Sequence, residues 1–411
     1  MSNPVFCGGP CQSYWWADEH EPIHPTVSAE LREPVDSVSL GRAWAETLRA
    51  YPLLDCFVDD EDETVVFFRA KGTSRPVRSA MPVELVSEAT ALRAASVTYW
   101  ERSVTLSVYH SLVDERGLFE VFKTLLRSYF ARLEGTEPDA AYAPIATDLA
   151  PEHYFVQNTK LTPRDYEVQP VTLYRESRHI YQDASIVKDG GILITNAELS
   201  IAAGPFYALC DKYGASADEL FAYVVARGIY AGDLDERRDL CIALMTDFRD
   251  TFGVSQSIAP CSKRMPLVVS RHDIVEQEMG SALRAIAATR EQQKSDDYIK
   301  THVAMENTYA VLEVRNACLA INFTGELDLG AATEQVTNVS MWGYSLRSAY
   351  MIRLGEKLLV NLQYGAAADR YMRAVIETLG DLGVESHVVK EQYAVPTESP
   401  TPVAITKGAR A

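Results

Sequence analysis

Residues 104–117 read VTLSVYHSLVDERG, and the fold that the sequence predicts is decided in this stretch. Apolar side chains occupy alternate positions of its first part, at Val104, Leu106 and Val108. This spacing is typical of a β-strand with one buried face. The alternation puts His110 on the same face, where the strand gives way to a loop, and Tyr109 on the opposite face.

Asp114 lies four residues after His110, directly before the longest amphipathic helix of the sequence. The apolar positions of that helix recur at helical spacing: Leu118, Val121, Phe122, Leu125, Leu126, Tyr129, Phe130 and Leu133. A histidine at a strand end can take up and return a proton near neutral pH, and a nearby carboxylate can fix its surroundings. From spacing alone, two plainer interpretations stay open. Asp114 can cap the helix, and His110 can be a satisfied, half-buried histidine.

Strand and helix patterns continue on both sides of this stretch. The sequence predicts helices at Val38–Tyr51, from Ser216 or Asp218 to about Tyr230, at Ile274–Gln293 and at 368–382. It predicts strands at Thr64–Arg69, Ile192–Leu199, Leu240–Thr246, Cys318–Phe323, Val336–Trp342, Ala349–Leu354 and Leu358–Tyr364. The proline-rich segment 134–172 is interpreted as a crossing between two halves.

Composition limits the classes of function. The 411 residues, 47 % hydrophobic and 23 % charged, are typical of about two globular domains. The formal net charge of −18 disfavours nucleic acid as a partner. No apolar run approaches the roughly 20 residues of a membrane span. Seven scattered cysteines are typical of reduced thiols, so we expect a cytoplasmic protein.

The stretch around His110 resembles the His-His-x-x-x-Asp-Gly signature of nonribosomal-peptide condensation domains, plant-type acyltransferases and polyketide-associated acyltransferases. His110 matches the second, catalytic histidine, and Asp114 matches the structural aspartate. Looser similarities to this superfamily occur at Val35–Phe57, Leu199–Tyr230, Thr246–Arg249 and Ile321–Leu327. The resemblance covers about residues 35–385.

The resemblance implies an α/β fold of two chloramphenicol-acetyltransferase-like sandwich lobes, with the active site in a channel between them. Residues 1–170 would form the N-terminal lobe with the crossing segment, and residues 171–390 the C-terminal lobe. We expect a disordered tail at 391–411.

The implied activity is transfer of an acyl group from a thioester to a hydroxyl or amine acceptor, with His110 as the general base. The donor would be acyl-CoA or the phosphopantetheine thioester of an acyl or peptidyl carrier protein. No permanently bound cofactor and no metal is implied. The setting would be natural-product or lipid biosynthesis, the acceptor a small molecule, and the protein a monomer.

The same resemblance assigns roles to further residues. Asp114 would hold the catalytic loop, and Arg249 would take part in a structural ion pair. The expected substrate-binding residues are Tyr109, Asn322, Thr324, Gly325 and Ser345. Of these, the candidate donors to a developing oxyanion are Asn322, Thr324 and Ser345.

The sequence departs from the family pattern at three positions. Tyr109 replaces the first histidine, and its expected role is packing. Glu115, bulky and negative, replaces the glycine after the aspartate. Asp55 stands where the family has an arginine that often pairs with the motif aspartate. Two facing carboxylates would repel, so either Arg116 or Arg249 supplies the cation or the local architecture differs.

Three rival functions are weighed against acyl transfer. A serine or cysteine hydrolase is disfavoured because the sequence has no G-x-S-x-G elbow. A metalloenzyme is disfavoured because spacing places no third ligand beside His110 and Asp114. A catalytically divergent or inactive member, acting as a binding or scaffold module, is supported by Asp55 and Glu115.

Overall fold

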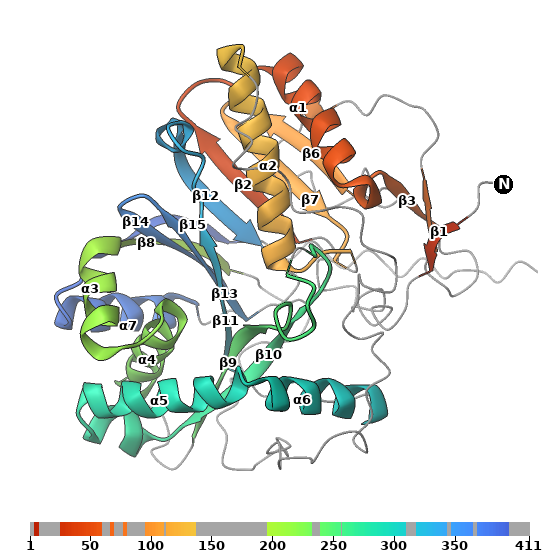
Figure 1. Cartoon of the computed structure of the whole chain (residues 1–411). Helices are drawn as coiled ribbons and strands as arrows, with labels where there is room; N and C mark the ends of the chain where they lie inside the picture. Colours follow the sequence, from red (N-terminus) through yellow and green to blue (C-terminus); the bar gives the residue numbers. More distant parts are fainter. Residues whose placement is uncertain are drawn as a thin grey trace, which may run out of the picture.

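A computed structural model describes residues 4–7, 25–59, 66–69, 77–79, 95–110, 112–136, 195–231, 239–255, 257–309, 318–342, 347–364 and 368–393. In these residues the chain forms two α/β lobes, each built on its own sheet, as Figure 1 shows. The predicted two-lobed α/β fold is therefore confirmed.

The N-terminal lobe is built on a five-stranded sheet with the order β12-β2-β7-β6-β5. Its strands are β2 (Thr26–Leu31), β5 (Arg78–Ser79), β6 (Ala95–Trp100), β7 (Ser103–Val108) and β12 (Val336–Trp342). Helices α1 (Ser37–Ala50) and α2 (Glu115–Glu134) lie side by side on one face of this sheet (Figure 1). A separate three-stranded sheet is formed by β1 (Pro4–Cys7), β3 (Cys56–Asp59) and β4 (Val66–Arg69).

Strand β12 comes from the second half of the sequence but completes the sheet of the first. It pairs antiparallel with β2, with Ser340 opposite Ser28 and Trp342 opposite Thr26. The N-terminal sheet therefore contains a strand beyond the predicted lobe boundary at residue 170. The boundary itself falls in 137–194, outside the described residues.

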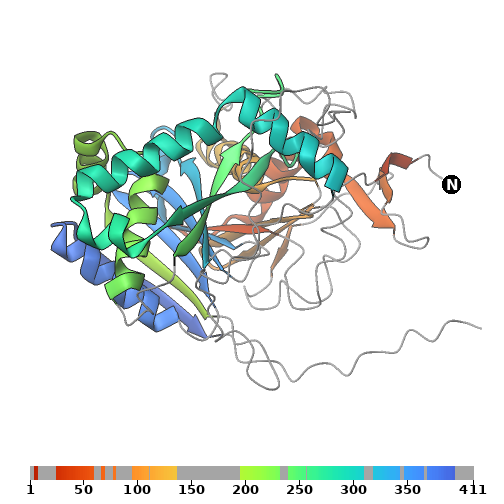
Figure 2. The same ribbon diagram turned by 90° about the horizontal axis from the view of Figure 1, so that it is seen from below.

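The C-terminal lobe is built on a seven-stranded sheet with the order β10-β9-β11-β13-β14-β8-β15. Its strands are β8 (Thr195–Ala202), β9 (Leu240–Asp247), β10 (Ser262–Val269), β11 (Leu319–Glu326), β13 (Ser348–Leu354), β14 (Lys357–Tyr364) and β15 (Ser386–Tyr393). The lobe's helices are α3 (Ala203–Tyr213), α4 (Ala217–Ala231), α5 (Met279–Gln293), α6 (Asp296–Tyr309) and α7 (Ala368–Asp381). Figure 2 shows α3, α4, α5 and α7 on the side of this sheet away from the N-terminal strands.

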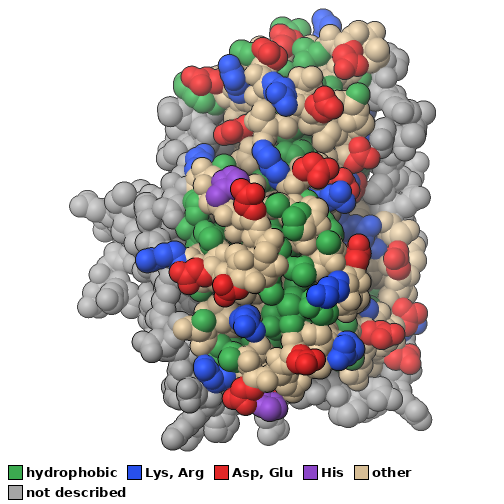
Figure 3. Space-filling view, turned by 90° about the vertical axis from the view of Figure 1, so that its left-hand side faces the viewer, with side chains coloured by type: hydrophobic (Ala, Val, Ile, Leu, Met, Phe, Trp, Pro, Cys, Tyr) green, Lys and Arg blue, Asp and Glu red, His purple; other side chains and the backbone are tan. Residues whose placement is uncertain are grey.

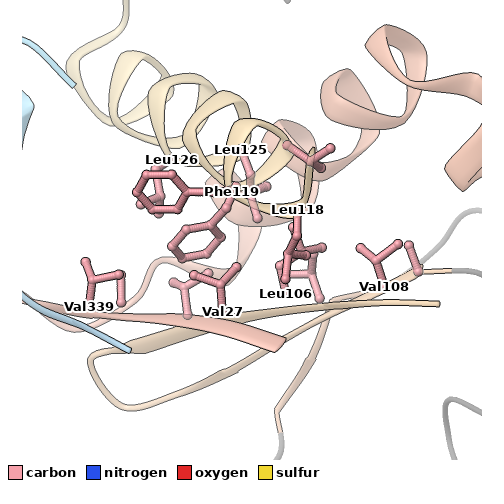
Figure 4. Close-up of a cluster of buried hydrophobic side chains, with 14 of the residues drawn as sticks. Val27, Leu106, Val108, Leu118, Phe119, Leu125, Leu126 and Val339 are labelled. Carbon is pink, nitrogen blue, oxygen red and sulfur yellow. The ribbon is translucent and has the colours of Figure 1, made fainter. Parts of the chain in front are cut away.

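Helix α2 begins within the sequence stretch 104–117 and packs against the core of the N-terminal lobe. Asp114 is its N-cap, and Gly135 ends it in the left-handed conformation (φ 68°), which glycine adopts without strain. The helix lays its apolar face over strands β2, β7 and β12, so that Phe119 lies above Val27 (Figure 4). Burying each such side chain contributes about 1.5–3 kcal/mol, which fixes the helix on the sheet.

The two lobes share this core. Tyr350, Ile352 and Leu354 of β13 and Leu359 of β14 belong to the same buried cluster as the residues of α2. Alternate residues on the same strands, such as Met351 and Val360, belong to the second cluster, beneath the helices of the C-terminal lobe. Sheet alternation thus gives the large sheet two apolar faces, one for each lobe.

Several predicted elements are confirmed to within a few residues, among them the β13–β14 hairpin, whose turn has Gly355 at φ 55°. The expected tail from residue 391 is wrong over its first residues, because β15 continues to Tyr393 and pairs with β8. The rest of that tail lies outside the described residues. Among the described helices, none is long and apolar enough to cross a membrane. The face at the left of Figure 1 carries acidic and basic side chains interspersed around hydrophobic ones (Figure 3).

Candidate active site at the junction of the two lobes

His110 lies just beyond the end of β7 and is 3 % exposed. Its ring Nδ1 is 2.8 Å from the carbonyl oxygen of Val113. Because a carbonyl only accepts, Nδ1 carries the proton and donates it to this bond. In the neutral ring the lone pair is therefore on Nε2. This hydrogen bond fixes both the orientation and the tautomer of His110.

The pKa of His110 lies below its ordinary value. Burial is the main cause, because it disfavours the charged imidazolium. The carboxylates of Glu115 and Asp114 oppose this effect, and the Arg264 guanidinium adds to it. The ring is therefore neutral at pH 7, which is the form that a general base requires.

Asp114 is 2 % exposed, and its carboxylate accepts four hydrogen bonds. Oδ1 accepts from the Gly117 backbone N–H at 2.9 Å and from Arg249 Nη2 at 2.7 Å. Oδ2 accepts from the Cys261 backbone N–H at 3.0 Å and from Ser262 Oγ at 2.9 Å. Burial alone would raise the pKa of Asp114, but Arg249 and these donors hold it below its ordinary value. The interpretation of Asp114 as a helix cap is also correct.

Arg249 brings the second lobe to this carboxylate. It is 1 % exposed and follows β9. Besides Asp114, its guanidinium donates to Asp247 Oδ1 at 3.0 Å, to the Ser257 carbonyl at 2.6 Å and to the Ala259 carbonyl at 2.8 Å. Despite burial, the Asp114 carboxylate raises the pKa of Arg249. The planar fork of the guanidinium satisfies all of these acceptors at once.

The backbones of the two lobes are also in close contact at this junction. A Cβ atom on Gly117 would lie 1.9 Å from the carbonyl oxygen of Ile258. Only glycine therefore fits at this position of α2. The family pattern places a glycine directly after the aspartate. Here that position is Glu115, and the glycine that the packing requires is two residues further on.

The sequence left open which cation faces Asp114. The structure gives Arg249 this role, whereas Arg116 forms an ion pair with Asp247. Asp55 ends the short 3-10 turn Pro52–Leu54 and is not among the main causes that set the pKa of Asp114. The anticipated carboxylate repulsion is therefore replaced by an ion pair between the lobes.

The remaining predicted residues lie on other elements. Tyr109 is 2 % exposed and packs within the N-terminal core. Asn322 lies on β11, directly after Ile321, and is 9 % exposed. The Thr324 hydroxyl donates to the Met351 carbonyl at 3.3 Å. Ser345 lies outside the described residues.

Gly325 has φ 120° at an irregularity in the β11–β13 pairing. This conformation favours glycine, and nothing lies within 4 Å of where its Cβ would be. The backbone conformation at this strand irregularity therefore accounts for a glycine at position 325. Helix α2 packs against β11, the strand that carries Asn322.

Sequence reasoning missed several residues of this junction. Cys261 and Ser262 hold Asp114, Ser257 and Ala259 hold Arg249, and Arg264 acts on His110. Three of the contacts come from backbone groups, which leave no side-chain pattern in the sequence. The spacing of Asp247 and Arg249 was the one signal in the sequence that pointed to this junction. Among the described residues, no group of three metal-ligating side chains is present.

Comparisons with known proteins agree with this architecture. No family model matches the sequence, and no curated protein matches it. Among solved structures, polyketide synthase associated protein 5 from Mycobacterium tuberculosis has a TM-score of 0.68 at 10 % identity, covering 92 % of this chain and 98 % of its own. The first condensation domain of the calcium-dependent antibiotic synthetase has 0.67 at 14 %, covering 94 % and 100 %. TRI101 of F. sporotrichioides, complexed with coenzyme A and T-2, has 0.61 at 11 %, covering 90 % and 98 %. At these identities the likeness shows the fold: that of condensation domains and related acyltransferases.

Proposed function

We propose that this protein transfers an acyl group from a thioester to a hydroxyl or amine acceptor, with His110 as the general base. The observation that carries the proposal is the state of His110. Its ring is buried, neutral at pH 7 and held by the Val113 carbonyl so that Nε2 has the lone pair. It also stands beside the ion pair that joins the lobes.

The reaction needs no covalent enzyme intermediate. Nε2 of His110 removes the proton of the acceptor as its oxygen or nitrogen attacks the thioester carbonyl carbon. The tetrahedral intermediate then collapses, the C–S bond breaks, and the imidazolium returns the proton to the thiolate. The products are an ester or amide and a free thiol. Holding both substrates at one base supplies much of the rate.

Asp114 and Arg249 support this chemistry indirectly. Their ion pair and the associated backbone bonds fix the start of α2 against the loop after β9, which keeps the segment from His110 to Asp114 in place. Among the expected oxyanion donors that lie in the described part of the chain, Asn322 is the one that we favour. We propose it in preference to Thr324, whose hydroxyl already donates to the Met351 carbonyl.

For the donor we propose acyl-CoA or a phosphopantetheine thioester on a carrier protein. Two features support a thioester carrier of this kind: the fold is that of condensation domains, and TRI101 of the same fold was solved with coenzyme A. The acceptor is a small molecule, and the biosynthesis of natural products or lipids is the proposed setting.

The test is an assay of free thiol released from a panel of acyl-CoAs in the presence of amine and alcohol acceptors. We expect His110→Ala to lower turnover by at least 100-fold, the lower range of general-base catalysis. The control His272→Ala, at an exposed histidine of the C-terminal lobe, should retain turnover. Full activity in His110→Ala would exclude His110 as the base.

The second candidate function is a binding module without turnover, which Glu115 in place of the family glycine favours. In that case wild-type protein would release no thiol from any donor, yet coenzyme A would still raise its melting temperature. The two assays together separate an enzyme from a binding module.

A further inference from the structure

Glu115 is the first residue of α2 and directly follows Asp114. It is 4 % exposed, which is unusual for a glutamate, because carboxylates are rarely buried without a partner. Its position beside the base separates it from the exposed acidic residues of the surface.

The charges of the junction can be matched pair by pair, and Glu115 is left over. Asp114 pairs with Arg249, and Asp247 pairs with both Arg249 and Arg116. Among the residues that the structure describes, no side chain makes an ion pair or a hydrogen bond with Glu115. The amide dipoles of the first turn favour a carboxylate there, but by only about 0.3–1 kcal/mol, which is small beside the cost of burying a charge.

The Glu115 carboxylate is close to the reacting centre. Its negative charge is the largest influence, after burial, on the protonation of His110. The site next to the proposed base therefore contains a carboxylate that forms no ion pair with Arg116 or Arg249, which hold Asp247 and Asp114.

We propose that the Glu115 carboxylate binds the amino group of the acceptor, which makes this protein an amide-forming acyltransferase. The inference rests on the proposed function and narrows it to amine acceptors. An ammonium group supplies both the positive charge and the N–H donors that an ionised carboxylate lacks here. An alcohol can donate one hydrogen bond but leaves the charge unbalanced, and an anionic acceptor is repelled.

The reaction balances as follows. The amine binds as an ammonium ion against Glu115 and releases one proton to solvent before it reacts. The neutral amine attacks the thioester carbonyl carbon and forms the C–N bond, while His110 takes its second proton. The C–S bond breaks, and the imidazolium gives that proton to the departing thiolate. One amine and one thioester thus give one amide and one thiol.

The test uses full-length protein, acetyl-CoA and longer acyl-CoAs, and matched acceptors: hexylamine with hexanol, and phenethylamine with phenethyl alcohol. Amides and esters are counted by mass spectrometry. We expect amides to predominate, and Glu115→Gln to raise KM for the amines about 10–100-fold, as expected for loss of a charge-assisted bond. Ester formation should change less than about 3-fold. Glu134→Gln, at the exposed far end of the same helix, is the matched control.

Different contrary results would refute different claims. Esters in excess, or an equal loss of amide and ester formation in Glu115→Gln, would overturn the role of Glu115 and leave acyl transfer standing. An equal loss of amide and ester formation, together with a shifted pH profile of the activity, would mean that Glu115 acts only through His110. If no donor gives any product, the proposed function fails. Calorimetric measurement of hexylamine binding then tests the role of Glu115 separately. Equal affinity of wild type and Glu115→Gln for hexylamine would refute that role.

Discussion

Arg249 Nη2 lies 2.7 Å from Asp114 Oδ1, and this buried ion pair joins the strand end of one lobe to the helix start of the other. Both side chains are almost wholly inaccessible to solvent. Each also has backbone partners, so the pair is part of a network rather than an isolated contact. Such a network makes the two lobes dependent on each other.

Removing one charge of this pair should destabilise the whole protein. Asp114→Asn leaves the buried Arg249 with only the half-exposed Asp247, which it shares with Arg116, and the amide nitrogen cannot accept hydrogen bonds. We expect a loss of about 3 kcal/mol in the free energy of unfolding, measured by urea denaturation. Glu134→Gln, at the exposed C-terminal end of the same helix, should cost under about 1 kcal/mol. Equal losses in the two variants would contradict the central role of Asp114.

The same ion pair should make stability depend on acid. The folded-state pKa of Asp114 is depressed, so its contribution is present above the unfolded value of about 3.9 and is lost as pH falls through the lower folded value. The difference in stability between wild type and Asp114→Asn should therefore be largest at neutral pH and shrink below about pH 4. Unfolding curves from pH 3 to pH 7 measure it. A difference that grows on acidification would refute this assignment.

Glu198 on β8 should behave in the opposite direction. Burial raises its pKa, although it accepts a hydrogen bond from Asn338 Nδ2 at 2.8 Å. Stability is then lost as pH rises through the folded-state pKa, because the buried side chain must ionise. Glu198→Gln keeps an acceptor and cannot ionise, so it should be more stable than wild type at pH 8 and equal to it near pH 4. Melting temperatures at both values check this.

Gly117 should tolerate no side chain. In Gly117→Ala the methyl group would collide with the Ile258 carbonyl, so the loop after β9 must move away from α2. We expect a loss of about 1–3 kcal/mol and a marked fall in activity. Gly204→Ala, in α3, meets nothing within 4 Å and should be neutral or slightly stabilising. Wild-type stability in Gly117→Ala would show that the junction is not closely packed.

The activity should persist to lower pH than an ordinary histidine allows. Because burial lowers the pKa of His110, the ring stays neutral, and therefore basic, below about pH 6.5. With an alcohol acceptor, which loses no proton of its own to solvent in this range, the profile of kcat/KM should be flat from pH 8 to pH 6.5 and fall only at lower pH. A decline that begins above pH 7 would mean that another group limits the reaction.

Local patterns in the sequence predicted the elements that carry the site. The alternation of residues 104–108 gave β7, and the apolar spacing from Leu118 to Leu133 gave α2, because both patterns depend only on near neighbours. The Gly355 turn likewise predicted the β13–β14 hairpin. The position of His110 between strand and helix followed from these two elements.

Contacts between distant segments could not be predicted in the same way. Arg249 and Asp114 are 135 positions apart, and several of their partners are backbone groups. The pattern could name Arg249 and Arg116 as candidate cations but could not decide between them. The requirement for glycine at position 117 depends on the Ile258 backbone, which no pattern within α2 reveals.

The placement of β12 has a consequence for how the chain is made. During translation, β2 can pair with β7 on one side, but its other edge has no partner until the ribosome has passed residue 342 and β12 can add to it. A shortened chain ending before Val336 would expose that edge to other copies of itself. The two lobes are thus separate in shape but linked in synthesis, because the sheet of the first lobe is complete only after a strand of the second half has been made.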